Sequence, residues 1–259
     1  MKKFQFLSVI VLLCCVLTSF CYGEMLLKSS AMLIQEEAKA GKLALELELT
    51  YLAYAVRAPE RLPVEYRTDF LTTGNTSATP IIRYINQNLD KVNSSTRQHI
   101  NTILDRPESM GFIQSTTYPL RIHWTATSTE ADAVFVQGFI ENCWFVEVDE
   151  WGWRPPFPDN GMEGSDDYDV YVHVMQYAGY VNPEERVTGI DWMAYTSHAV
   201  INPQTGSMGS TCAHEFNHVC QDSTDIVEAD FLFEQTATYI MCQVYPDGSN
   251  YTFLREFQK

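Results

Sequence analysis

The chain has 259 residues, of which 46% are hydrophobic, and this is enough to build one good-sized core. It carries 33 acidic residues against 17 basic ones. This acidic balance excludes a surface that binds nucleic acid through its phosphates, and it favours solubility.

Residues 1–23 have the pattern of a secretory signal peptide. The segment opens with two lysines, continues with an apolar run over residues 6–17, and ends on small residues. Because the run is short for a spanning helix, we expect cleavage before Glu24, a secreted or periplasmic protein, and no membrane span in the mature chain. Lipid attachment at Cys21 is an alternative, although Phe20 fits poorly before a modified cysteine.

Four cysteines remain outside this segment: Cys143, Cys212, Cys220 and Cys242. An even number in an exported protein permits two disulfides, and the sequence leaves all three pairings open. A bridge between Cys212 and Cys220 would brace the segment that they flank. A zinc–thiolate cluster is disfavoured because there is no C-x-x-C pair, and buried free thiols remain an alternative.

The first part of the mature chain is expected to be helical. Residues 25–57 are apolar and rich in Ala and Glu, which predicts helix with a break at Gly41. A polar loop over residues 68–80 precedes a second helical stretch over residues 81–104. We therefore expect an N-terminal helical region over residues 24–115. It is either a plain helical subdomain or a pro-segment that covers the site during export.

The hydrophobic pattern of the sequence changes from about residue 118, where segments typical of strands appear between segments typical of helices. Strands are expected over residues 120–124, 168–175 and 193–201, and helices over residues 130–150, 211–221 and 230–244, with a turn-rich loop over residues 153–167. This order predicts an α+β fold, with residues 116–259 as its second domain.

The stretch TCAHEFNHVCQ, residues 211–221, contains the pattern H-E-x-x-H. On a helix, His214 and His218 lie on one face and can both bind one ion, and neutral imidazole suits zinc. Glu215 can reach a water in the open coordination position as a general base. The pattern alone occurs by chance in roughly one such chain in a hundred, so its context matters.

A third zinc ligand is predicted at Glu234, within the apolar run FLFEQTATYIMC. An unpaired carboxylate inside so apolar a helix is costly, and a zinc ion would supply its partner. Glu228 is the second candidate, followed by Asp222 and Asp225. These three belong to a polar stretch, and we expect them to be solvated.

The segments HEFNHVCQ, FLFEQTATYI and VYPDGSNY resemble the MXAN-type family of bacterial secreted zinc metalloproteases. Softer matches, such as APERLPVEY, PPFPDNG and SDDYDVYVHVM, extend the resemblance over most of residues 40–255. It implies a zincin-like core of the gluzincin type, with a mixed sheet and an active-site helix. By this resemblance His214, His218 and Glu234 hold zinc, and Glu215 is the catalytic base.

The implied activity is hydrolysis of a peptide or protein substrate. Longer relatives continue well beyond the third ligand, so we expect a minimal or C-terminally truncated member. Tyr239 and His198 are candidate donors to the transition state. One alternative is an inactive zinc-binding or structural exported protein. Another is a cysteine hydrolase that uses Cys212 or Cys220. A serine hydrolase lacks its G-x-S-x-G signature.

Overall fold

The computed structural model describes residues 28–68 and 77–246. The predicted signal peptide, most of the polar loop and the last 13 residues, 247–259, lie outside the described residues. Within the described ranges no helix combines the length and the apolar character needed to cross a bilayer.

The first predicted helical stretch is a pair of helices, α2 (Ser30–Lys39) and α3 (Leu45–Arg57). They are separated at Gly41, whose φ of +73° lies in the left-handed region that glycine adopts without strain, so the predicted break is confirmed. Two 3₁₀ turns, Pro59–Arg61 and Val64–Tyr66, follow α3.

The second predicted stretch is also divided. It consists of α4 (Thr79–Asn86), a 3₁₀ turn (Leu89–Lys91) and α5 (Ser94–Leu104). Helix α5 starts afresh because the Asn93 side chain accepts a hydrogen bond from the Thr96 backbone N–H, which caps the helix. The predicted helical stretch over residues 81–104 is therefore present, but it is divided between two helices.

The sheet is made of β1 (Gly111–Gln114), β2 (Leu120–Trp124), β3 (Tyr168–Val172), β4 (Gly179–Arg186) and β5 (Tyr195–Ile201). Its strand order is β1-β2-β3-β5-β4. The inner pairs are parallel, whereas β1 and β4 run antiparallel to their neighbours at the two edges. The sheet is therefore mixed, and the α+β prediction is confirmed.

The sequence did not indicate β1 or β4. Strand β4 begins with Gly179 and contains Pro183, and both residues weaken a strand pattern, although an edge strand tolerates proline. Strand β1 pairs with β2 from Gly111 onward. It therefore belongs with the sheet, although it precedes the expected domain boundary after residue 115.

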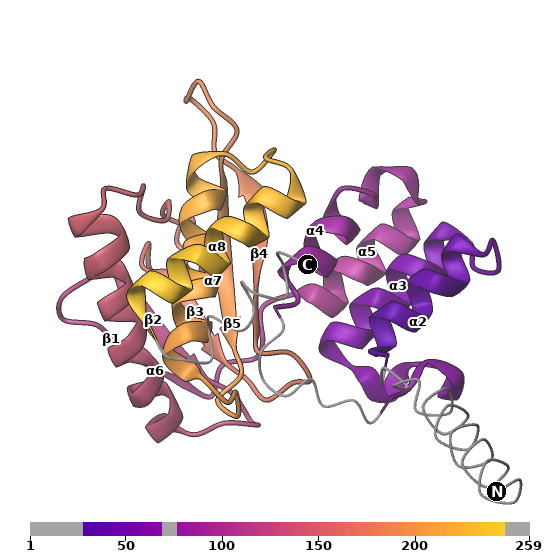
Figure 1. The fold of residues 1–259 in the computed structure, drawn as a ribbon, viewed down its shortest axis with the longest axis horizontal. Coiled ribbons are helices and arrows are strands. Elements are labelled where there is room, and N and C mark those ends of the chain that lie inside the picture. The colour runs from indigo at the N-terminus through magenta and orange to yellow at the C-terminus, as the bar shows by residue number, and fades with distance from the viewer. Residues whose placement is uncertain (1–27, 69–76, 247–259) are drawn as a thin grey trace, which may run out of the picture.

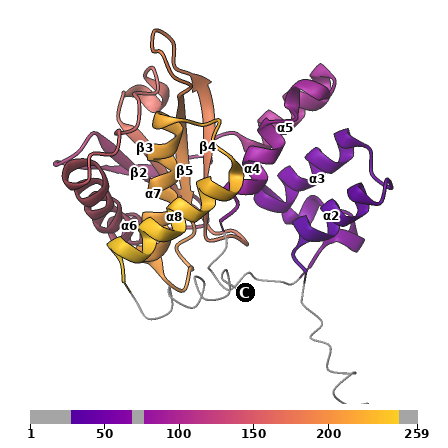
Figure 2. The same ribbon diagram turned by 45° about the horizontal axis from the view of Figure 1, so that its top comes forward.

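The helices of the second part are α6 (Glu130–Cys143), α7 (Met208–Thr224) and α8 (Asp230–Val244), with a short 3₁₀ turn at Met162–Gly164. Helix α6 continues as a π-helical segment, Trp144–Glu150, so the long helix predicted over residues 130–150 is present with a widened last part. Figures 1 and 2 show α2–α5 on one side of the sheet and α6–α8 on the other.

Both faces of the sheet are buried. Successive side chains on a strand point to opposite faces, so alternate residues pack on opposite sides. Val170, Val172, Ala199 and Ile201 pack against α6 and α7. The alternate residues Tyr171, Tyr180 and Val200 pack against the N-terminal helices. The helical region is therefore part of the core of the protein.

The four cysteines outside the predicted signal peptide are buried and form no disulfide, so the alternative of buried thiols holds and the permitted disulfides are absent from the described residues. Cys212 and Cys220 both lie on α7, eight residues apart, which separates them by about 12 Å along the helix axis. A disulfide needs Cα atoms within about 7 Å, so these two thiols cannot pair.

Candidate metal centre

Helix α7 carries the H-E-x-x-H pattern into the interior of the protein. It follows β5 closely and lies between the sheet and helices α6 and α8, so almost all of its residues are buried. His218 is fully buried, whereas the side chain of His214 is 12% exposed. One end of the motif therefore reaches the surface, and the other faces the core.

Three of the predicted side chains converge: His214, His218 and Glu234. The two histidine Nε2 atoms are 3.1 Å apart. Glu234 Oε1 lies 3.1 Å from Nε2 of His218, and Oε2 lies 3.4 Å from Nε2 of His214. Helix α8 therefore brings the Glu234 carboxylate to the histidine face of α7, where a third ligand was expected.

These separations can be compared with the geometry of a metal site. Zinc binds nitrogen and oxygen ligands at about 2.0–2.1 Å in a tetrahedral arrangement, which places any two ligand atoms about 3.3–3.4 Å apart. The separation between the two Nε2 atoms, and the separation of each Nε2 from its nearer Glu234 oxygen, are within about 0.3 Å of this value, with a different carboxylate oxygen facing each histidine. Glu234 Oε1 is also buried without a hydrogen bond. The residues present therefore fit a divalent zinc-like ion, with Glu234 half-buried at the open side.

Gln221 determines which nitrogen of His218 faces the cluster. Its Nε2 donates to the backbone oxygen of Phe233 at 3.0 Å, so its Oε1 must face His218. That oxygen lies 2.8 Å from His218 Nδ1, which therefore carries the hydrogen and leaves Nε2 as a free lone pair. This is the arrangement that metal-binding histidines adopt, and the Phe233 ring stacks on His218 at 4.8 Å.

The carboxylate of Glu215 is 1% exposed and is enclosed by two other elements. Thr79, the first residue of α4, lies with its Oγ1 3.0 Å from Glu215 Oε2. Strand β4 passes so close at Gly179 that a Cβ atom there would lie 2.7 Å from Glu215 Cγ. A glycine is therefore needed at this position to make room for the carboxylate.

Burial and neighbouring charges shift the pKa values of the site's ionisable side chains in opposite directions. Burial raises the pKa of the Glu215 carboxyl, and the nearby His214 and His218 only partly offset this rise. Burial also acts on the Glu234 carboxyl. When no metal is bound and the histidines are protonated, the charge of His218 and hydrogen bonds from both rings outweigh burial and hold the pKa of Glu234 well below its usual range. A bound metal ion would take the place of these protons. Burial lowers the pKa of His214, but the hydrogen bond to Glu234 and the negative charges of Glu215 and Glu234 together outweigh burial and raise that pKa above its ordinary value.

The other acidic candidates lie elsewhere. Glu228 and Asp225 are exposed on the connection between α7 and α8, as predicted. Asp222 is 3% exposed, so its predicted solvation is wrong. Helix α7 extends to Thr224, and Asp222 comes four residues after His218, on the same buried face.

Neither candidate donor is part of the cluster. Tyr239 is 56% exposed on α8, and five residues of helix turn it by about 140° from Glu234. His198 lies on β5, where its Nδ1 contacts Glu184 Oε1 at 2.9 Å. Their role as donors stays a prediction.

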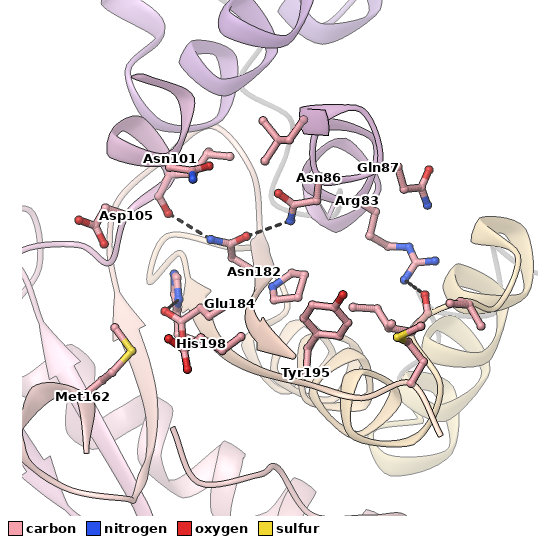
Figure 3. Close-up of a pocket in the computed structure, with 17 residues that line it drawn as sticks. Arg83, Asn86, Gln87, Asn101, Asp105, Met162, Asn182, Glu184, Tyr195 and His198 are labelled. Carbon is pink, nitrogen blue, oxygen red and sulfur yellow. Dashed lines mark hydrogen bonds and ion pairs between the residues drawn. The ribbon is translucent and has the colours of Figure 1, made fainter. Parts of the chain in front are cut away.

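A cavity of about 740 Å³ lies beside β4. Figure 3 shows Asn182, Glu184 and His198 at its wall, with Asn86 and Arg83 of α4 opposite. The three converging ligand groups do not line it. The cavity and the cluster are therefore separate. The connection between α7 and α8 lines the cavity, and these two helices carry the cluster.

Comparison of the chain with protein-family models, with curated proteins and with solved structures gives no match.

Sequence reasoning missed three residues that hold this site: Gln221, Thr79 and Arg83. Gln221 has a local signal, because it follows His218 by three residues on the same helix. Thr79 and Arg83 have none, since they meet α7 and α8 across separations of 136 and 147 residues.

Proposed function

We propose that the chain is a secreted zinc-dependent metallopeptidase of the gluzincin type, built on a zincin-like core. The observation that carries this proposal is the convergence of His214, His218 and Glu234 at tetrahedral ligand separations, with Glu215 next to the first ligand in the chain. The pattern of residues 1–23 supports export, and the substrate would be a peptide or protein.

The three ligand groups would hold zinc, which supplies a Lewis acid for the scissile carbonyl and lowers the pKa of a water. Glu215 would accept a proton from the attacking water and deliver it to the leaving amine nitrogen. A buried carboxylate with a raised pKa is a better base than a solvated one, which suits this role. Gln221 would keep His218 in the tautomer that a ligand needs.

A second candidate is an inactive zinc-binding protein with the same core. It is favoured by one observation: the Glu215 carboxylate is buried and already accepts a hydrogen bond from Thr79. In that case Glu215 would only hold α4 against α7 through its hydrogen bond with Thr79.

The test is hydrolysis of a mixture of fluorogenic peptides by the purified, zinc-loaded protein. We expect cleavage that a chelator such as 1,10-phenanthroline abolishes and that added zinc restores. Zinc binding without any hydrolysis would favour the inactive candidate, and hydrolysis that resists complete metal removal would contradict both.

A further inference from the structure

Helix α4 belongs to the N-terminal helical region, yet it contacts both α7 and α8, the two helices that carry the candidate metal ligands. Thr79 and Arg83 are one helical turn apart on α4 and are 2% and 4% exposed. Thr79 reaches Glu215 on α7, and Arg83 reaches the beginning of α8. Figure 2 shows α4 beside strand β4, between the other N-terminal helices and the sheet.

The contacts of Arg83 fix the segment that precedes Glu234. Its guanidinium donates to Asp230 Oδ1 at 2.9 Å and to the backbone oxygens of Ile226 and Glu228 at 3.2 and 2.9 Å. It also lies 3.8 Å from the centre of the Phe233 ring, which stacks on His218. This anchoring fixes the position of α4 relative to the metal centre.

The hydroxyl of Thr79 has only one direction in which it can donate. The backbone N–H of Val181 donates to Thr79 Oγ1 at 2.9 Å, so this oxygen already acts as an acceptor. Its single hydrogen therefore goes to Glu215 Oε2 at 3.0 Å. The Ala78 N–H donates to the Gly179 oxygen at 2.8 Å and fixes the start of α4 on the same strand.

A carboxylate has about four lone-pair positions, so hydrogen bonds from the Thr79 and Ser77 hydroxyls still leave Glu215 able to accept from a water. Contacts with β4 and α4 restrict the conformation of the Glu215 side chain before it reacts. A small displacement of a catalytic group can lower the rate by about a hundredfold. We propose that Thr79 is a positioning residue for Glu215, contributed by the N-terminal helical region. This inference rests on the proposed function, and it requires that the region stay attached in the working protein.

The test compares Thr79→Val, which keeps the shape and loses the hydroxyl, with Thr79→Ser, which keeps the hydroxyl. Thr50→Val is the matched control, since Thr50 on α3 donates to its own helix and not to the site. For Thr79→Val we expect zinc affinity and KM within about threefold of wild type and kcat lowered by about tenfold to a hundredfold. Thr79→Ser should recover most of this loss.

A second readout does not depend on turnover. Acetohydroxamate chelates zinc and shares a proton with an adjacent carboxylate, so its affinity reports how Glu215 is placed. We expect Thr79→Val to weaken its binding by about tenfold in the wild-type background and to have no further effect beside Glu215→Gln. Thr79→Ala repeats the comparison if Thr79→Val does not fold.

The outcomes separate this inference from the proposed function. Wild-type protein that binds no zinc would overturn both. Zinc binding with equal effects of Thr79→Val in the two backgrounds would overturn the role of Thr79 alone. A rise in kcat for Thr79→Val would also overturn it, because α4 would then be blocking the site.

Discussion

Glu215→Gln is expected to lower kcat by at least about a thousandfold while the protein keeps its zinc. The amide has nearly the shape of the carboxylate and can still accept the Thr79 hydroxyl hydrogen, but it cannot take a proton from water. Zinc is retained because Glu215 is not among the three groups whose ligand atoms converge.

The folded protein should tolerate this change well. Glu215 is buried, and burial raises the pKa of its carboxyl, so a neutral amide removes the cost of placing a charge there. Zinc content, the unfolding midpoint and kcat should be measured on the same preparations. Glu228→Gln, an exposed site on the connection to α8, is the matched control and should behave as wild type. Glu215→Gln with undiminished turnover would remove the general base from the mechanism.

The second large effect concerns Glu147, on the π-helical segment behind α7. Its side chain is fully buried, and Asn217 Nδ2 donates to its Oε2 at 3.0 Å. Glu147 Oε1 and Asn217 Oδ1 are both buried without partners. A protonated carboxyl has a hydroxyl that can donate to Asn217 Oδ1, which would satisfy both atoms.

Burial raises the pKa of Glu147 to about 8, against the opposing effect of the Asn217 hydrogen bond. The folded protein therefore holds this proton up to about pH 8, whereas the unfolded chain releases it near pH 4.5. Between these values the folded state binds more protons, so stability falls as pH rises. Its contribution is fully present below about pH 4.5 and is lost by about pH 8.

Glu147→Gln should abolish this part of the pH dependence, because an amide pairs with Asn217 in the same way at every pH. We expect the variant to be more stable than wild type by about 2–4 kcal/mol at pH 8 and equal to it within about 1 kcal/mol at pH 4.5. Urea unfolding at the two pH values measures this difference. Exposed Glu150→Gln, on the same segment, is the control, and parallel curves for Glu147→Gln and wild type would contradict the account.

The parts of the site that could be predicted are those with a local signature. His214 and His218 share a helix face by their spacing, and Glu234 stands out as a carboxylate in an apolar helix. Both inferences need only the helical period, and the structure brings all three side chains together.

The parts that could not be predicted depend on long-range packing. Strand β4 is hard to predict from the sequence because Gly179 and Pro183 interrupt its alternating pattern. Gly179 is nevertheless required where the strand passes Glu215. Thr79 looks like an ordinary residue at the start of a helix, and only the folded chain brings it to the carboxylate. The buried position of Asp222 was missed because α7 continues through a polar sequence.

If α7 and α8 together form a zinc site, the purified protein should hold zinc, and elemental analysis measures its stoichiometry most directly. Wild-type protein and Glu234→Ala should be folded with added zinc and freed of excess metal. We expect one zinc per chain in the wild type, and loss or at least tenfold weaker binding in the variant. Wild-type protein without zinc, or a variant that binds zinc as tightly as wild type, would contradict the account.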